Sequence, residues 1–255
     1  MIEVTKIRFQ DMPMGIFDKV GYDSAFEYYQ VNQGAHVLGR FIAYDNEFHL
    51  NHKYINLVDE TFFKLTIKSI IKIIRNYFDK PLQVMVDSNA EEIIDGLINN
   101  GFILKRQCFE RAFQMASVIK LDSKLVDLHV FNKGAKAYDR GCSLAFDHYV
   151  KTHKDVNPFT AKKEHFIEFL PNKIICQIVD DKIVNLVFID ENELCYFASN
   201  NESQFEMFSH SVIRFMFERY QSITFEVDST DELGLKFKSY FNDTSNDSFD
   251  TYVYK

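Results

Sequence analysis

Residues 82–88 (LQVMVDS) and residues 223–229 (ITFEVDS) share one pattern, and this pattern decides the fold. Each stretch is a short apolar run, typical of a strand, that ends in Val-Asp-Ser. The closing serine of each run is a suitable helix N-cap, and acidic residues follow it. Because carboxylates in the first turn are stabilised by the helix dipole, a short helix is expected after each strand, over residues 90–99 and 231–241.

The same order of elements precedes both stretches. Residues 40–48 (RFIAYDNEF) and residues 186–194 (LVFIDENEL) each read as an apolar strand, an acidic turn and a second strand. A long apolar helical pattern follows each pair, over about residues 59–78 and 202–220, and it predicts a helix packed on a sheet. The unit strand–strand–helix–strand–helix therefore occurs twice, which indicates an internal duplication.

The two copies are separated by a polar stretch at residues 117–124, which is too short for a long flexible linker. We therefore predict two domains, residues 1–118 and residues 119–255. Each is expected to contain a mixed, mostly antiparallel sheet with flanking helices, which places the chain in the α+β (mixed α/β) class. Two further helical patterns open only the second copy, at residues 136–151 and 160–169.

Composition limits the classes of function. The chain has 255 residues, and 46% of them are hydrophobic, which is enough to bury a core. A net charge of −8 argues against nucleic acid as the main partner, because phosphate binding needs clustered Lys and Arg, and it mildly favours a cationic substrate. Residues 1–10 lack the apolar run of a signal peptide, and no apolar stretch suits a membrane span. We therefore expect a cytoplasmic protein without membrane contact.

Local spacing predicts no metal site. No two cysteines form a C-x-x-C pair, and their spacing does not suggest a disulfide scaffold; the cysteines are Cys108, Cys142, Cys176 and Cys195. His49 and His52, like His148 and His153, are interpreted as ordinary core or surface residues, because a metal needs three or four ligands.

The end of the first copy carries a resemblance to a known family. Residues 97–102 (LINNGF), followed by Cys108-Phe109-Glu110, look like the short helix and strand that close the fold of GNAT-superfamily N-acetyltransferases. Gly101 suits the position after a helix end, where a positive φ is needed. The order of long helix, Val-Asp-Ser strand and short helix is also that of the family. The chain thus resembles two GNAT-like halves in tandem.

This resemblance implies a cofactor site with altered residues. GNAT enzymes hold the pyrophosphate of acetyl-CoA with an R/Q-x-x-G-x-G/A loop at the start of the long helix, where backbone N–H groups face the phosphates. In the second copy Gln204 matches the first position, but Met207 and Ser209 replace the glycines, and Glu202 and Glu206 add negative charge. The first copy has no glycine there, so the second is expected to be active. The implied acetyl-CoA contacts are Phe197, Ala198, Ser199, Ser203, Gln204, Phe205, Met207 and Ser209.

The resemblance also implies catalytic groups. Catalysis in the family needs a base for the amine and an acid for the leaving thiolate. Glu193 or Glu226 is the candidate base, and Tyr240 or Tyr196 is the candidate acid. Tyr240 lies two positions past the slot that the family uses. Solvated carboxylates at strand ends and tyrosines of the core are the alternative interpretations of these residues.

Three functions remain open at this point. The first is an acyl-CoA-dependent N-acetyltransferase that acts on a small-molecule or peptide amine, with the C-terminal half active. The second is a non-catalytic GNAT-like binding or scaffold protein, which could be a homodimer; the missing loop glycines motivate it. The third is transfer from another activated acyl donor, such as an aminoacyl group.

Overall fold

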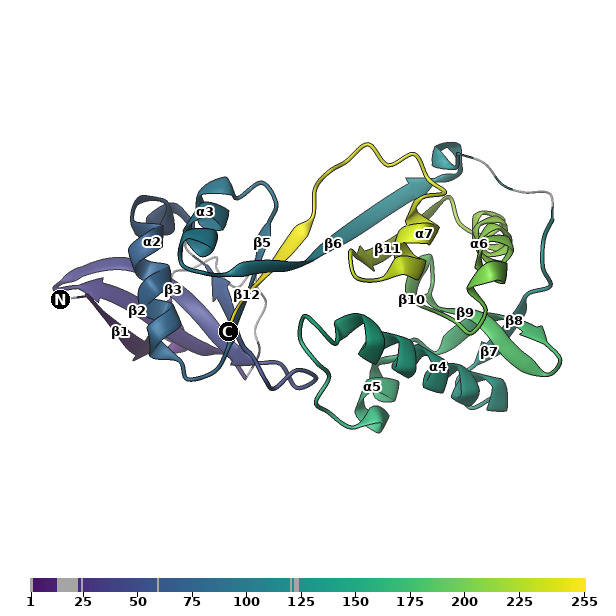
Figure 1. The fold of residues 1–255 in the computed structure, drawn as a ribbon, viewed down its shortest axis with the longest axis horizontal. Helices are drawn as coiled ribbons and strands as arrows, with labels where there is room; N and C mark the ends of the chain where they lie inside the picture. Colours follow the sequence, from purple (N-terminus) through teal and green to yellow (C-terminus); the bar gives the residue numbers. More distant parts are fainter. Residues whose placement is uncertain (1, 13–22, 24, 59, 120, 122–123) are drawn as a thin grey trace. The chain divides into compact units, whose positions relative to one another are not determined.

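The computed structural model describes the chain from Ile2 to Lys255, apart from residues 13–22, 24, 59, 120 and 122–123. It confirms the predicted mixed α/β class (Figure 1). The chain forms two compact units. Unit 1 comprises Met1–Gln107, Asp155–Thr160 and Phe249–Lys255, and unit 2 comprises Cys108–Lys154 and Ala161–Ser248. None of the described helices is long and apolar enough to cross a membrane.

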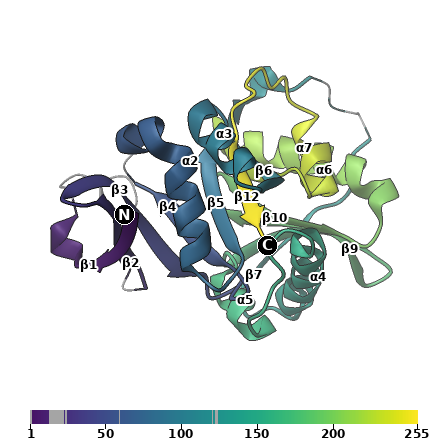
Figure 2. The ribbon, with the colours of Figure 1, turned by 60° about the vertical axis from the view of Figure 1, so that its left-hand side comes forward.

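The sheet of unit 1 has the strand order β1-β2-β3-β4-β5-β12. Only the pairing of β4 with β5 is parallel; the other neighbours in this order are antiparallel. Two helices, α2 and α3, pack side by side and contribute Ile70, Ile74 and Leu97 to the core (Figures 1 and 2). The elements are β1 (Ile2–Ile7), the 3₁₀ helix η1 (Phe9–Asp11), β2 (Glu27–Gln33), β3 (His36–Asp45), β4 (Lys53–Leu57), α2 (Glu60–Tyr77), β5 (Leu82–Asp87), α3 (Glu91–Asn99) and β12 (Phe249–Tyr254).

The sheet of unit 2 has the order β6-β11-β10-β9-β8-β7, and here the parallel pair is β10 with β11. Helices α6 and α7 bury Phe205, Phe208 and Phe237 against one face. Helix α4 packs on the opposite face, where Gly141 lies against Ile174. The elements are β6 (Ile103–Gln114), the 3₁₀ helix η2 (Met115–Ser117), β7 (His129–Asn132), α4 (Lys136–His153), α5 (Lys163–Phe169), β8 (Lys173–Val179), β9 (Lys182–Asp190), β10 (Glu193–Ser199), α6 (Glu202–Phe217), β11 (Ser222–Asp228) and α7 (Glu232–Lys238).

Each copy gives its last strand to the other. Strand β6 ends the first copy, yet it pairs antiparallel with β11 of the second. Strand β12 ends the second copy and pairs antiparallel with β5 of the first. The compact units therefore differ from the predicted ranges 1–118 and 119–255 at these strands. An apolar pattern identifies a strand, but it does not state which sheet edge the strand joins.

The starts of the two short helices correct one sequence prediction. Ser88 and Ser229 are not the N-caps. Helix α3 begins after Ala90, and helix α7 begins after Asp231, whose carboxylate accepts a hydrogen bond from the first turn. A backbone turn intervenes after the strand, in which the Asp231 N–H donates to the Asp228 carbonyl at 2.9 Å. Gly101, by contrast, has the predicted positive φ, at +85°.

The strand exchange can be tested with Tyr252 of β12, which lies opposite Val84 in unit 1 and is 3% exposed. We expect Tyr252→Ala to lower the free energy of unfolding by about 3–5 kcal/mol, because a large buried ring is lost. Phe249→Ala, on the same strand but 47% exposed, is the control and should change it by less than about 0.5 kcal/mol. Urea titration of both variants makes the comparison, and equal effects would contradict the burial of β12.

Candidate functional site

Strands β10 and β11 part soon after they meet. Their parallel pairing consists of Glu193 with Thr224 and Leu194 with Phe225. Along the rest of its length in the described chain, β10 pairs with β9 on one side, and β11 pairs with β6 on the other. Facing backbone edges of two separating strands can pair with an extended ligand, as a peptide adds to a sheet edge.

The α4 side of this divergence is polar. Side chains alternate along a strand, and Phe225 and Val227 of β11 face the α6–α7 core. Glu226 and Asp228 therefore point to the α4 side, where Cys108 of β6 lies directly opposite Asp228. The Cys108 thiol donates a hydrogen bond to Glu226 Oε1, with 2.9 Å between sulfur and oxygen. The Cys108 sulfur and one carboxylate oxygen each of Glu226 and Asp228 all lie within 4.8 Å of one another. We call Cys108, Glu226 and Asp228 the thiol–carboxylate cluster.

The end of α4 brings two histidines to the same region. His153 Nε2 is 3.8 Å from Asp228 Oδ2, and His148 Nε2 is 2.9 Å from Asp231 Oδ1. The His153 ring also stacks on Tyr149, with 3.9 Å between ring centroids. Charged and titratable groups of β6, β11, α4 and the start of α7 therefore meet on one face of the unit 2 sheet.

The structure brings Tyr196 and Glu226 together on this face. Tyr196 of β10 packs against Tyr149 of α4 and Phe166 of α5. Burial, together with smaller electrostatic effects of Cys195, Glu226 and Glu193, raises the pKa of Tyr196 to about 12. Its hydroxyl is therefore protonated at neutral pH, and it can act as a hydrogen-bond donor.

The other two predicted catalytic residues lie elsewhere. Glu193 is exposed at the start of β10, opposite Asp190. Tyr240 packs with the α6–α7 core on the opposite face of the sheet, 4.7 Å from the His210 ring centroid. Burial, with the charge of Glu206, raises the pKa of Tyr240 to about 12. For Tyr196 the sequence alternation did not give the face, because a bulge in β10 between Leu194 and Tyr196 shifts it.

The predicted acetyl-CoA contacts divide into two groups. Several are buried or bonded inside the protein: Phe197, Ala198 and Phe205 are buried, and the buried Ser209 hydroxyl donates to the Phe205 carbonyl at 2.8 Å. Ser203 is exposed and Met207 is half-buried at the start of α6, so these two side chains reach the surface.

A chain of hydrogen bonds fixes the start of α6. Gln177 donates to Gln204 Oε1 at 2.9 Å, and the fully buried Asn185 donates to Gln177 at 2.7 Å. Ser199 donates to Asn185 at 2.5 Å and accepts from the Asn201 N–H at 3.0 Å. The side chains of Gln204 and Ser199, both predicted to bind the cofactor, therefore hold strands β8, β9 and β10 to the helix start. Sequence reasoning missed Gln177 and Asn185, whose only signal is an amide within an apolar strand.

The first copy lacks the equivalent polar residues. In the shared Val-Asp-Ser pattern, Met85 of β5 corresponds to Glu226, and Phe249 lies opposite Asp87 where the second copy has Cys108. Both replacements are exposed, Met85 by 41% and Phe249 by 47%. The thiol–carboxylate cluster therefore belongs to unit 2, and unit 1 has no equivalent at these positions.

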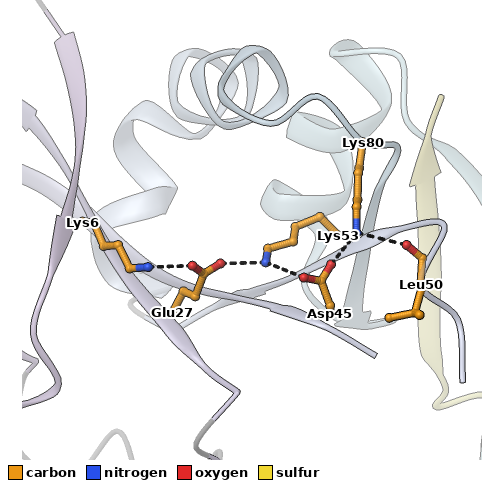
Figure 3. A network of polar contacts seen from close by, with 6 residues as sticks. All are labelled: Lys6, Glu27, Asp45, Leu50, Lys53 and Lys80. Atoms are coloured by element: carbon orange, nitrogen blue, oxygen red, sulfur yellow. Dashed lines mark hydrogen bonds and ion pairs between the residues drawn. The ribbon is translucent and has the colours of Figure 1, made fainter. Parts of the chain in front are cut away.

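Unit 1 has a different polar cluster, which lies where the parallel strands β4 and β5 begin (Figure 3). Lys53 starts β4, is 8% exposed, and contacts Glu27 at 2.6 Å and Asp45 at 3.2 Å. Lys6 contacts Glu27 at 2.6 Å, and Lys80 contacts Asp45 at 2.9 Å. Beside this charge network is a hollow of about 270 Å³, lined by Glu27, Tyr29, Asp45, Lys53, Tyr77, Phe78, Asp79 and Lys80.

Comparison with known proteins agrees with this geometry. An acetyltransferase of the GNAT family from Colwellia psychrerythraea aligns over 99% of this chain and 100% of its own, with 9% identity and a TM-score of 0.55. The fold is that of the GNAT acetyltransferases. A GCN5-related N-acetyltransferase from Sphaerobacter thermophilus also shares the GNAT fold, over 93% of this chain and 83% of its own, with 9% identity and a TM-score of 0.53.

A tandem GNAT protein from the clavulanic acid biosynthesis pathway aligns over 100% of this chain and 98% of its own, with 6% identity and a TM-score of 0.45. No family model and no curated protein matches the sequence.

The charge network of unit 1 should make stability depend on pH. Hydrogen bonds from Lys53 and then Lys6 lower the pKa of Glu27. A carboxyl whose pKa is lower in the folded state stabilises the fold above its unfolded pKa of about 4.3, and this contribution is lost as the pH falls through the folded value. We expect Lys53→Met to cost about 1–2 kcal/mol at pH 7 and to reduce the loss of stability between pH 5 and pH 2. Urea titrations across this range test the effect.

Lys6→Met is the matched control, because Lys6 contacts the same carboxylate from a side chain that is 59% exposed. Solvent weakens exposed ion pairs, so this change should have a smaller effect at every pH. Equal effects of the two substitutions would contradict a dominant role for the buried Lys53.

Proposed function

We propose that this protein is an acyl-CoA-dependent N-acetyltransferase whose active half is the C-terminal one. The GNAT fold supports acyl transfer in general, since this is the chemistry of the proteins that share it. The single observation that carries the assignment to the second half is the Glu226–Tyr196 face beside the diverging strands. In the first half a methionine, Met85, holds the position of Glu226.

Glu226 is the proposed base. It is exposed on the α4 side of β11, so an amine can reach it from solvent. Glu110 lies directly opposite on β6, and Asp228 is two residues further along β11. These carboxylates attract a cationic small-molecule or peptide amine before Glu226 accepts its proton.

Tyr196 is the proposed acid. As the amine nitrogen bonds to the acyl carbon, the carbon–sulfur bond breaks and the sulfur takes a proton from the Tyr196 hydroxyl. The proton lost by the amine goes to Glu226. At the end of the step Glu226 is therefore protonated and Tyr196 is deprotonated. The raised pKa of Tyr196, about 12, keeps that proton in place until the thiolate forms.

The fit of acetyl-CoA differs along its length. The separating backbone edges of β10 and β11 suit a pantetheine arm, which pairs with main-chain groups and needs no particular side chain. The start of α6 suits a diphosphate less well, because residues 200–209 contain no Lys or Arg and include Glu202 and Glu206. We therefore propose acetyl-CoA as the donor with weak affinity for its nucleotide end, and another activated acyl donor as the alternative within the same chemistry.

One observation favours a second function, a non-catalytic GNAT-like binding or scaffold protein. Gln204, the residue that matches the phosphate loop, is bonded to Gln177, and its chain of amides extends into the buried sheet. A helix start held in this way has a structural role without any ligand.

The test is an acetyl-transfer assay with acetyl-CoA and a panel of amines, in which the released thiol is followed. We expect Glu226→Gln to lower kcat/KM by about 10²- to 10⁴-fold, the usual contribution of a general base, without loss of the folded circular dichroism spectrum. Glu193→Gln is the matched control on the neighbouring strand and should retain near-normal activity.

Two results would contradict the proposal. Calorimetry without heat and without a thermal shift at millimolar acetyl-CoA would favour the scaffold function. Robust transfer that is equally insensitive to Glu226→Gln and to Tyr196→Phe would place the chemistry outside this face.

A further inference from the structure

The thiol–carboxylate cluster has the composition of a metal site. Cys108, Glu226 and Asp228 each offer a donor atom, and these three atoms lie within 4.8 Å of one another. Strand register explains the arrangement: Cys108 and Asp228 face each other across the β6–β11 ladder, and Glu226 is two positions along on the same face. The side chains are thus held by a regular part of the sheet, which makes their spacing a consequence of backbone geometry.

His153 lies next to the cluster. Its Nδ1 is 2.9 Å from the Tyr149 carbonyl and 3.1 Å from Thr152 Oγ1, and its Nε2 is 3.8 Å from Asp228 Oδ2. It is therefore the neighbouring imidazole rather than one of the three ligand atoms already within 4.8 Å of one another. Metal-binding histidines commonly donate their second N–H to a backbone carbonyl in this way, which fixes the ring.

The local charge also favours a cation. Glu226 and Glu110 are directly opposed on neighbouring strands, and Asp228 lies on the same face. Like charges in opposed positions destabilise a sheet. Arg111 of β6 points to the other side and contacts Asp243 at 2.8 Å, whereas Arg106, two residues before Cys108, lies on the same face as the carboxylates.

We propose that unit 2 binds one Zn²⁺ ion through Cys108, Asp228 and Glu226, and that the His153 ring, 3.8 Å from Asp228, turns toward the ion to complete its coordination. Sulfur and imidazole ligands with carboxylates suit zinc, whereas Mg²⁺ and Ca²⁺ take oxygen ligands. Tetrahedral zinc with bonds of about 2.0–2.3 Å separates its ligand atoms by roughly 3.3–3.8 Å. Cys108 Sγ and Glu226 Oε1 form a hydrogen bond at 2.9 Å, so these two side chains must move apart by about 0.5–1 Å when the ion binds. The exposed Glu226 provides a path for the ion from solvent.

Sequence analysis predicted no metal site because it relied on local spacing. Cys108 and Glu226 are 118 residues apart, and they become neighbours only because β6 crosses from the first copy to pair with β11. The first copy offers no equivalent site, since Met85 and Phe249 take the places of Glu226 and Cys108.

Zinc binding has a consequence that rests on the proposed function, although the binding itself does not. A Glu226 carboxylate that ligates Zn²⁺ cannot accept a proton from an amine. Zinc would therefore inhibit acetyl transfer, and a chelator would restore it.

The direct test uses the full chain after treatment with a chelator, titrated with Co²⁺ as a spectroscopic substitute for Zn²⁺. We expect one Co²⁺ per chain, a thiolate-to-metal charge-transfer band, and loss of that band when Zn²⁺ is added. Cys108→Ser should abolish the band. His153→Gln and Glu226→Gln should each weaken Co²⁺ binding at least about 10-fold, since each removes one ligand.

Matched controls lie on the same strands. Cys195→Ser removes another thiol of unit 2, one whose pKa burial raises to about 12, and Glu110→Gln removes the carboxylate opposite Glu226. Both should keep the band and the stoichiometry. Because Glu226 and Glu110 are exposed, their variants test the proposal even where Cys108→Ser fails to fold.

The proposal is overturned if the wild-type chain gives no thiolate band, or if Glu226→Gln and Glu110→Gln bind Co²⁺ equally well. These outcomes are separate from those of the transfer assay. If the protein binds zinc but transfers no acetyl group, the metal-site proposal holds and the proposed function is wrong. If the protein is active but zinc neither binds nor inhibits it, the proposed function holds and the metal-site proposal is wrong.

Discussion

The short parallel pairing of β10 with β11 is the constraint on which the unit 2 site depends. Two residue pairs hold the strands together, and then each strand follows its outer neighbour. The divergence leaves backbone edges between them and turns Glu226 and Tyr196 toward α4 and α5. If the two strands paired along their whole length, the backbone edges between them would be occupied by each other. The packing of Phe225 and Val227 on the α6–α7 core keeps this orientation.

The exchange of final strands makes the site a joint product of both copies. Cys108 is encoded by the first copy, while Glu226, Asp228 and His153 are encoded by the second. Neither copy alone contains the thiol–carboxylate cluster. The pairing of β6 with β11 brings Cys108 beside the two carboxylates, whereas the pairing of β12 with β5 brings Met85 and Phe249 together at the corresponding positions of unit 1.

The start of α6 shows how a familiar element can change its role. A glycine-containing phosphate loop is replaced by a chain of amide hydrogen bonds that runs from Gln204 through Gln177 and Asn185 to Ser199. Buried polar groups of this kind need all their partners, because an unpaired one costs free energy. These hydrogen bonds therefore fix the start of α6 to strands β8, β9 and β10 without any glycine in residues 200–209.

Much of the fold could be predicted from the sequence, because apolar period and turn residues are local signals. The repeated Val-Asp-Ser strands, the long helices α2 and α6, and the positive φ of Gly101 all follow from them. The GNAT resemblance followed from the order of these elements. Glu226 and Tyr196 could be named as candidates from the same order, but their shared face could not be derived.

What the sequence determined by itself is the set of elements, their order and their repetition. Only the tertiary structure decided which edge β6 and β12 join, on which face Tyr196 and Tyr240 lie, and that Cys108 reaches Glu226 from 118 residues away. The physical reason is that periodicity reports how a segment buries its own apolar side. Strand partners and side-chain clusters depend on backbone hydrogen bonds between distant segments, which leave no local pattern in the chain.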